Sequence, residues 1–274
     1  MSLLGTPDFP SYIFHFQQMR VEVPFTDYVL TTQDPVTYYM TFGSCLVYLL
    51  LIFVIFPLFT PSTDEGKARA KAFAKFHHTC LFVYSAVSFS SALYHLLSSG
   101  EVFDFTAFLC NPVPAWLRCV SLSFIVSKMF EWPDTAIDIW KGRSVSRIGF
   151  LHCYHHCTTF FLFLLIENFP GLGKSGMLMN GFVHSLMYYH YAFRLPKAMR
   201  PLITGAQIVQ LVSSTWFWHI TPDTCPALAY YPQEHFAEFC FPYVFVPVYT
   251  LFFLKFFYET YITKPDSSKQ KKVA

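Results

Sequence analysis

Residues 77–97 read HHTCLFVYSAVSFSSALYHLL and contain no Asp, Glu, Lys or Arg. A helix of this length covers the hydrocarbon core of a bilayer, which is about 30 Å thick. Similar apolar runs recur along the chain of 274 residues, of which 54% are hydrophobic, 20% aromatic and only 13% charged. That charged share is about half the share in soluble domains. The composition predicts an all-α polytopic membrane protein with one domain over residues 1–274 and no nucleic-acid motif.

Segmentation by hydropathy gives seven candidate spans, each long enough to cross the bilayer. We expect them at about 36–59, 73–97, 116–140, 150–169, 175–193, 201–220 and 238–262, followed by a cytosolic tail at 263–274.

The basic residues are distributed unevenly between the two sides of such an arrangement. Fourteen of the 19 lie in alternate connections and the tail: Lys67, Arg69, Lys71, Lys75, Lys141, Arg143, Arg147, Arg194, Lys197, Arg200, Lys264, Lys269, Lys271 and Lys272. The opposite side receives Arg20, Arg118 and Lys174. By the positive-inside rule, the N-terminus lies outside the cytosol and the C-terminus inside it.

The chain ends with KKVA, in which Lys271 and Lys272 resemble a dilysine retrieval signal for the endoplasmic reticulum. Such a signal is an address read by a receptor. The alternative is a solvated basic tail.

The eight cysteines fall into two groups. Cys110 and Cys225 are in connections on the lumenal, oxidising side, where they can pair, although spacing does not fix the connectivity. The other six are interpreted as small apolar residues within or beside spans: Cys45, Cys80, Cys119, Cys153, Cys157 and Cys240.

Four stripes of polar side chains lie within or at the ends of spans, where ionisable groups are functional candidates. The third span ends with KMFEWPDT, which puts Lys128, Glu131, Asp134 and Thr135 on one face, with Pro133 expected to kink the helix. The fourth opens with LHCYHHC, which aligns His152, His155, His156 and Thr159.

The fifth span contains NGFVHSLMYYHY, which aligns Asn180, His184, Met187, Tyr188 and Tyr191, whereas Tyr189 and His190 point elsewhere. The sixth begins TGAQIVQ, with Thr204, Gln207 and Gln210 at intervals of three. All four stripes occupy the cytosolic half of their helices. They predict a polar chamber above an apolar region, which suits an amphiphile with a charged head, such as an acyl-CoA.

HxxHH alone fits two kinds of chemistry. Imidazole is a good iron or zinc ligand, as in membrane di-iron desaturases and hydroxylases. Those centres need several histidine boxes, and only one is present. His15, His219 and His235 map near the other side of the membrane. A neutral imidazole is also a nucleophile and a general base. Attack on a thioester would give an acyl-imidazole, with Asp134 or Asn180 orienting a second histidine.

The four stripes together resemble the signatures of the very-long-chain fatty acid elongases. KMFEWPDT resembles KxxExxDT, HCYHH resembles HxxHH, NGFVHSLMYYHY resembles NxxxHxxMYxYY, and TGAQIVQ resembles TxxQxxQ. The order also agrees. One departure is the pair His190-Tyr191, where the family has two tyrosines. Arg147 stands where elongases of polyunsaturated chains often carry glutamine, so the chain is nearer the saturated and monounsaturated subgroup.

The resemblance implies six helices around a narrow acyl tunnel, with the first helix outside. It also implies condensation of an acyl-CoA with malonyl-CoA to a 3-oxoacyl-CoA two carbons longer, without a metal or other cofactor. We expect His155 to attack the thioester, although His156 is equally spaced for this role. His184 would face it, and His152 and His156 would position the reacting groups.

Supporting roles fall on the remaining stripe residues, namely Lys128, Glu131, Asp134, Thr135, Asn180, Met187, Tyr188, Tyr191, Thr204, Gln207 and Gln210. Expected partners are the lipid bilayer, 3-oxoacyl-CoA reductase, 3-hydroxyacyl-CoA dehydratase, enoyl-CoA reductase and a second copy of the chain. Two rival interpretations are a metal-dependent membrane lipid desaturase or hydroxylase and a non-enzymatic transporter or receptor.

Overall fold

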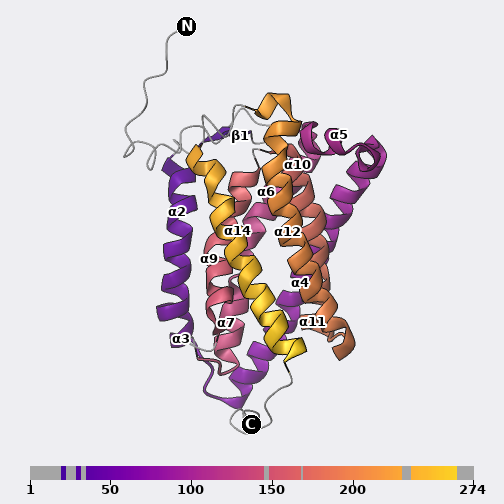
Figure 1. Ribbon diagram of the computed structural model, residues 1–274. Coiled ribbons are helices and arrows are strands. Elements are labelled where there is room, and N and C mark those ends of the chain that lie inside the picture. Colours follow the sequence, from indigo (N-terminus) through magenta and orange to yellow (C-terminus); the bar gives the residue numbers. More distant parts are fainter. Residues whose placement is uncertain are drawn as a thin grey trace.

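The computed structural model describes residues 20–22, 29–31, 35–144, 148–167, 169–229 and 236–263. The described chain is a helical bundle with one short antiparallel ribbon (Figure 1). In this ribbon β1 (Arg20–Glu22) pairs with β2 (Val29–Thr31), with Val21 opposite Leu30. The predictions for Arg147, for the tail from Lys264 onward and for His15 and His235 lie outside the described residues.

Long helical rods make up the bundle, several of them built from consecutive helices. The described elements are α2 (Pro35–Leu50), η1 (Leu51–Ile55), α3 (Phe56–Leu58), α4 (Asp64–Ser99), η2 (Glu101–Phe103), α5 (Phe105–Cys110), α6 (Ala115–Phe130), α7 (Pro133–Trp140), α9 (Phe150–Ile166), α10 (Pro170–Ser175), η3 (Gly176–Asn180), α11 (Gly181–Phe193), η4 (Lys197–Met199), α12 (Arg200–Thr224), η5 (Pro226–Leu228), α14 (Phe236–Phe257) and η6 (Tyr258–Ile262). Each of the seven ranges expected from hydropathy is almost entirely helical.

Two boundaries differ from expectation. Helix α4 begins at Asp64 rather than near 73, because the Thr63 side chain caps it by accepting a hydrogen bond from the backbone N–H of Gly66. The basic residues expected in a loop therefore lie on the first turns of α4. The connector expected at 168–176 is helical from Pro170 onward, so α10, η3 and α11 run as one rod from 170 to 193.

The third predicted span breaks at Pro133, as the sequence indicates. Helix α6 ends at Phe130 and α7 begins at Pro133, with Glu131 and Trp132 between them. Proline lacks an N–H and clashes with the preceding turn, so it favours a new helix start. The break lets Glu131 and Asp134 both reach the interior, where both side chains are buried.

Helix α9 lies at the centre of the packing, in contact with α2, α6 and α14. An apolar cluster of Ile125, Phe160, Phe161 and Leu165 joins α6 to α9. On the other side, α11 lies along α4. A Cβ at Gly181 would come within 3.2 Å of the backbone N of Phe89, so glycine permits the close approach of these two helices.

Two disulfides join parts of the chain that are distant in sequence. Cys110 at the end of α5 bonds to Cys225 just after α12, which is the pairing the sequence suggested. The interpretation of Cys45 and Cys157 as unpaired apolar residues is wrong, because the structure bonds them to each other. Packing of α2 against α9 brings their Cα atoms to 4.7 Å, a contact that local sequence does not encode.

Lys174 also departs from expectation, since the sequence placed it in an outer connection. Its side chain is fully buried at the α5 end of the bundle, in α10. The ammonium donates to Glu101 Oε2 at 2.6 Å and to the backbone oxygen of Asn111 at 3.2 Å. This ion pair connects α10 to the segment that follows α4.

Two helices in the described part of the chain are long and apolar enough to cross a membrane, Asp64–Ser99 and Cys240–Ile262. Gly43–Leu58 and Phe150–Ile166 are shorter apolar helices. The helical bundle is consistent with a membrane protein.

Candidate functional site

Lys128 lies at the centre of the buried polar residues and is only 1% exposed. Its ammonium donates to Glu131 Oε1 at 2.8 Å and to Asn180 Oδ1 at 2.9 Å, and lies 4.2 Å from the ring centroid of Phe124. The predicted i, i+3 pair is therefore present at the end of α6. Asn180 adds a link to the fifth predicted span that the sequence could not place.

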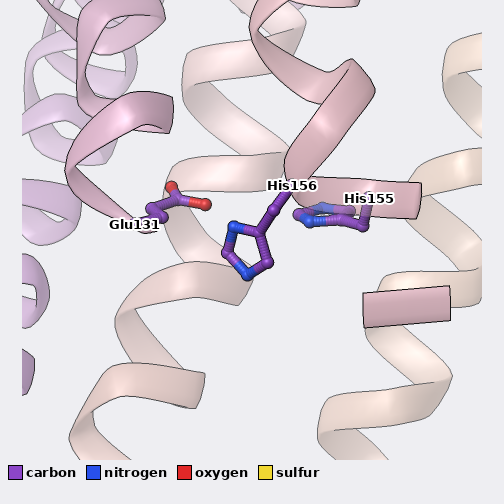
Figure 2. Close-up of side chains that lie close together, drawn as sticks. All are labelled: Glu131, His155 and His156. Carbon is purple, nitrogen blue, oxygen red and sulfur yellow. The ribbon is translucent and has the colours of Figure 1, made fainter. Parts of the chain in front are cut away.

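His155 and His156 of α9 lie beside the Lys128–Glu131 ion pair. One nitrogen each of His155 and His156 and one oxygen of Glu131 all lie within 4.8 Å of one another. Figure 2 shows the His156 ring between the Glu131 carboxylate and the His155 ring. The rings of His155 and His156 are nearly perpendicular, with centroids 5.3 Å apart.

His184 of α11 faces the same point from the opposite wall. Its Nδ1 lies 3.2 Å from Glu131 Oε1, and its ring centroid is 6.4 Å from that of His155. Glu131 is thus shared by Lys128 and His184. The sequence expectation that His155 and His184 face each other agrees with this geometry.

His152 and His156 lie beside each other, with ring centroids 4.4 Å apart, and neither lines the cavity described below. Thr135 Oγ1 is 2.9 Å from His152 Nε2. The indole N–H of Trp132 donates to the backbone oxygen of His156 at 3.0 Å. Trp132 in the break and Thr135 on the first turn of α7 therefore supply two contacts that orient this turn of α9.

Asp134 has partners that the sequence did not suggest. Its Oδ1 lies 3.2 Å from Nε2 of both His77 and His78 on α4, and its Oδ2 accepts the Tyr188 hydroxyl at 2.9 Å. In the described part of the chain, the carboxylate contacts these groups rather than the α9 histidines that it was expected to orient, because α4 packs against α7. Imidazoles in a membrane span are the signal that identifies His77 and His78.

The α12 stripe contributes amides. Asn180 Nδ2 donates to Gln210 Oε1 at 3.3 Å, and Gln207 Nε2 approaches Met187 Sδ at 3.9 Å. Thr204 is buried near the start of α12. Tyr191 is 50% exposed and lies beside His78, with ring centroids 5.3 Å apart.

A long cavity opens from this polar group between α9, α11, α12 and α14. His155, His184, Asn180 and Gln207 line one end, and Leu172 and Trp218 line the other. Gln207 and Trp218 are eleven residues apart on α12, which corresponds to about 16 Å along the helix. Tyr249 of α14 also lines the polar end, with its ring 5.6 Å from that of His155. No feature of its local sequence singles it out.

The donor set of Glu131, His155 and His156 is a poor match for a divalent metal. The ammonium of Lys128 already lies 2.8 Å from the Glu131 carboxylate and neutralises it. A fixed positive charge at that distance opposes binding of a second cation. The arrangement favours acid-base and nucleophilic chemistry by imidazole.

Known proteins are similar to this chain in sequence. The family model described as "ELO: GNS1/SUR4 family" matches residues 36–270. Fatty acid elongase A of Dictyostelium discoideum is 27% identical over 234 residues, which cover 82% of this chain and 83% of the relative.

Shorter matches have higher identity. "Putative fatty acid elongase 3" of Caenorhabditis elegans is 33% identical over 149 residues, 52% of this chain and 45% of the relative. "Very long chain fatty acid elongase 2" of Rattus norvegicus is 30% identical over 150 residues, 52% of this chain and 51% of the relative. The match thus spans about half the length of these two relatives. Because the family model covers most of the chain, the protein belongs to the ELO (GNS1/SUR4) family.

Proposed function

We propose that this protein condenses an acyl-CoA with malonyl-CoA to give a 3-oxoacyl-CoA two carbons longer, with release of CO2 and CoA. The observation that carries the proposal is the long cavity, which has His155 and His184 at one end and an otherwise largely apolar wall that ends at Trp218. A thioester fits the imidazole end, and its alkyl chain fits the space beyond. The names of the relatives, which describe fatty acid elongases, support the same reaction.

His155 is the proposed nucleophile because it lines the cavity, whereas His156 is buried behind it. A ring nitrogen of neutral His155 attacks the thioester carbonyl, the C–S bond breaks and CoA leaves as thiolate. The imidazole N–H proton passes to that thiolate, which leaves a neutral acyl-imidazole and CoA thiol. His184 and Glu131, beside the reacting carbon, hold this proton in transit.

Malonyl-CoA then occupies the emptied CoA position. Its carboxylate leaves as CO2, and the electron pair of the broken C–C bond forms an enolate. The enolate carbon attacks the acyl carbonyl, the C–N bond to His155 breaks, and the imidazole recovers one proton from solvent. The amides of Asn180 and Gln207 are placed to donate to the developing oxyanions.

The membrane arrangement is part of the proposal. All seven helical rods cross the bilayer, six of them form the bundle that contains the cavity with α2 outside, and the basic connections face the cytosol. Lys271 and Lys272 direct the protein to the endoplasmic reticulum. There the product passes to a 3-oxoacyl-CoA reductase, a 3-hydroxyacyl-CoA dehydratase and an enoyl-CoA reductase. Saturated and monounsaturated primers are the proposed subgroup, and the chain associates with a second copy.

One assay tests the reaction. Purified protein in detergent is given radiolabelled malonyl-CoA and a series of saturated acyl-CoA primers, with chelator and with added iron or zinc in parallel. We expect labelled 3-oxoacyl-CoA with chelator present. Failure to form product with any primer would contradict the proposal. A requirement for iron and oxygen would favour the desaturase or hydroxylase alternative.

Trp218 sets the length of primer in this proposal, because it is buried and closes the far end of the cavity against Phe169 and Leu172. We expect Trp218→Leu to extend the longest accepted primer by at least one two-carbon unit. The larger change to alanine would in addition remove about 3–5 kcal/mol of stability. Chromatography of the products made from a primer ladder measures the shift.

Trp216→Leu is the matched control, since Trp216 is on the same helix but 52% exposed and outside the cavity lining. The control should leave the product distribution unchanged. An unchanged distribution in a folded Trp218→Leu protein would contradict the assignment of the cavity floor.

A further inference from the structure

Tyr48 lies on α2, outside the four polar stripes, yet it is fully buried against the site. Its ring packs beside Trp132, with centroids 5.5 Å apart, and beside His156, at 5.9 Å. Ile52 and Trp132 complete this cluster, which Cys153 and Cys157 of α9 flank. Helix α2 therefore contacts the histidine helix directly, although it contributes no residue to the cavity wall.

Two hydrogen bonds link the Tyr48 hydroxyl to a histidine. The hydroxyl lies 2.9 Å from Thr135 Oγ1, which lies 2.9 Å from His152 Nε2. The two hydrogen bonds connect α2 to α9 through α7, and the bond between Tyr48 and Thr135 is buried.

The two hydrogen bonds share the Thr135 hydroxyl, which donates one hydrogen bond and accepts the other. With His152 Nε2 as acceptor, Thr135 donates to it and the Tyr48 hydroxyl donates to Thr135. With the proton on Nε2, His152 donates to Thr135, which donates to the Tyr48 oxygen. In both directions the Thr135 hydroxyl holds His152 Nε2 at hydrogen-bond distance.

We propose that Tyr48 is a positioning residue for the condensation reaction, acting through Thr135 on His152. The orientation of His152 holds the neighbouring ring of His156, which in turn lies against His155. The effect of Tyr48 is thus on the alignment of the nucleophile and not on binding of the primer. The expected effect of Tyr48 on kcat rests on the proposed function, whereas its effect on the orientation of His152 does not.

A double-mutant cycle tests the link from Tyr48 through Thr135 to His152, which we call the relay. Tyr48→Phe keeps the ring and removes only the hydroxyl, and Thr135→Val keeps the shape and removes the middle link. We expect each single variant to lower kcat about 10- to 100-fold, the usual effect of losing an outer partner of a functional histidine, with KM for acyl-CoA unchanged. The double variant should be no slower than Thr135→Val, because Tyr48 acts only through that residue.

Tyr84→Phe is the matched control, since its hydroxyl lies 2.7 Å from Ser123 Oγ between α4 and α6 and is not part of the Tyr48–Thr135–His152 link. It should retain the wild-type kcat. Additive losses in the double variant, or a rise in KM alone, would overturn the relay.

A readout independent of turnover separates the relay from the proposed reaction. Carbethoxylation by diethyl pyrocarbonate, mapped by mass spectrometry, needs a free imidazole nitrogen. We expect His152 to react faster in Tyr48→Phe than in the wild-type protein. In Thr135→Val and in the double variant it should react as fast as in Tyr48→Phe. Unchanged His152 labelling in Tyr48→Phe would overturn the relay even in an active enzyme. Inactive wild-type protein with the expected labelling would overturn the reaction alone.

Discussion

Replacing His155 by glutamine is expected to abolish condensation, with kcat reduced at least about 1,000-fold, because the amide does not form the acyl-enzyme intermediate. Glutamine keeps a polar side chain of similar reach at the mouth of the cavity, so binding of the primer should persist. Incubation of wild-type protein with acyl-CoA alone should increase the mass of the peptide that contains His155 by one acyl group, and the variant should lack this adduct.

Two other histidines provide the comparisons for this result. His219 lies in the C-terminal half of α12, and its imidazole contacts the hydroxyl of Tyr243 on α14. The variant His219→Gln should retain activity. His156→Gln should slow turnover while leaving the adduct on His155. An acyl group mapped to His156 or His184 would contradict the assignment of the nucleophile.

The second large effect concerns the buried ion pair at the centre of the site. Lys128→Met should lower the free energy of unfolding by about 3–5 kcal/mol, because it leaves Glu131 buried without its ammonium partner. For a chain of this size the loss corresponds to a fall in Tm of about 10 °C. Thermal unfolding of the detergent-purified protein, followed by tryptophan fluorescence, measures it.

The double variant Lys128→Met/Glu131→Gln should recover part of this stability, since no uncompensated charge remains. Lys67→Met is the exposed comparison, because Lys67 pairs with Asp64 on the solvated first turns of α4. Exposed pairs contribute little, so this variant should unfold at the wild-type temperature. A Lys128→Met protein with unchanged Tm would show that Glu131 does not depend on Lys128.

Contacts within one helix were predictable from the sequence. Lys128 and Glu131 are three residues apart, and the helical repeat alone places them together. The same repeat places His155 and His156 on one turn. The facing of His155 and His184 was also expected, on the resemblance of the four motifs to the elongase signatures.

Contacts between helices were less accessible. Asp134 was expected beside the α9 histidines, yet its partners are on α4 and α11, since the rotation of α7 about its axis depends on packing across several helices. Tyr48 carried no signal at all, because a tyrosine near other apolar residues is ordinary in a membrane helix. The pairing of Cys45 with Cys157 also carried no sequence signal, because it depends on the contact of α2 with α9.

The length of α4 has a consequence for how its two ends are related. Its 36 residues extend about 54 Å, well beyond the roughly 30 Å of a hydrocarbon layer. The early turns with Lys67, Arg69 and Lys71 project below the other helices in Figure 1, and the same unbroken helix carries His77 and His78 to Asp134. One residue inserted between Lys71 and Lys75 would turn the charged face by about 100° around the axis, whereas seven would nearly restore its phase. The contacts of His77 and His78 with Asp134 therefore fix the direction in which the basic residues on the first turns of α4 project around the helix axis.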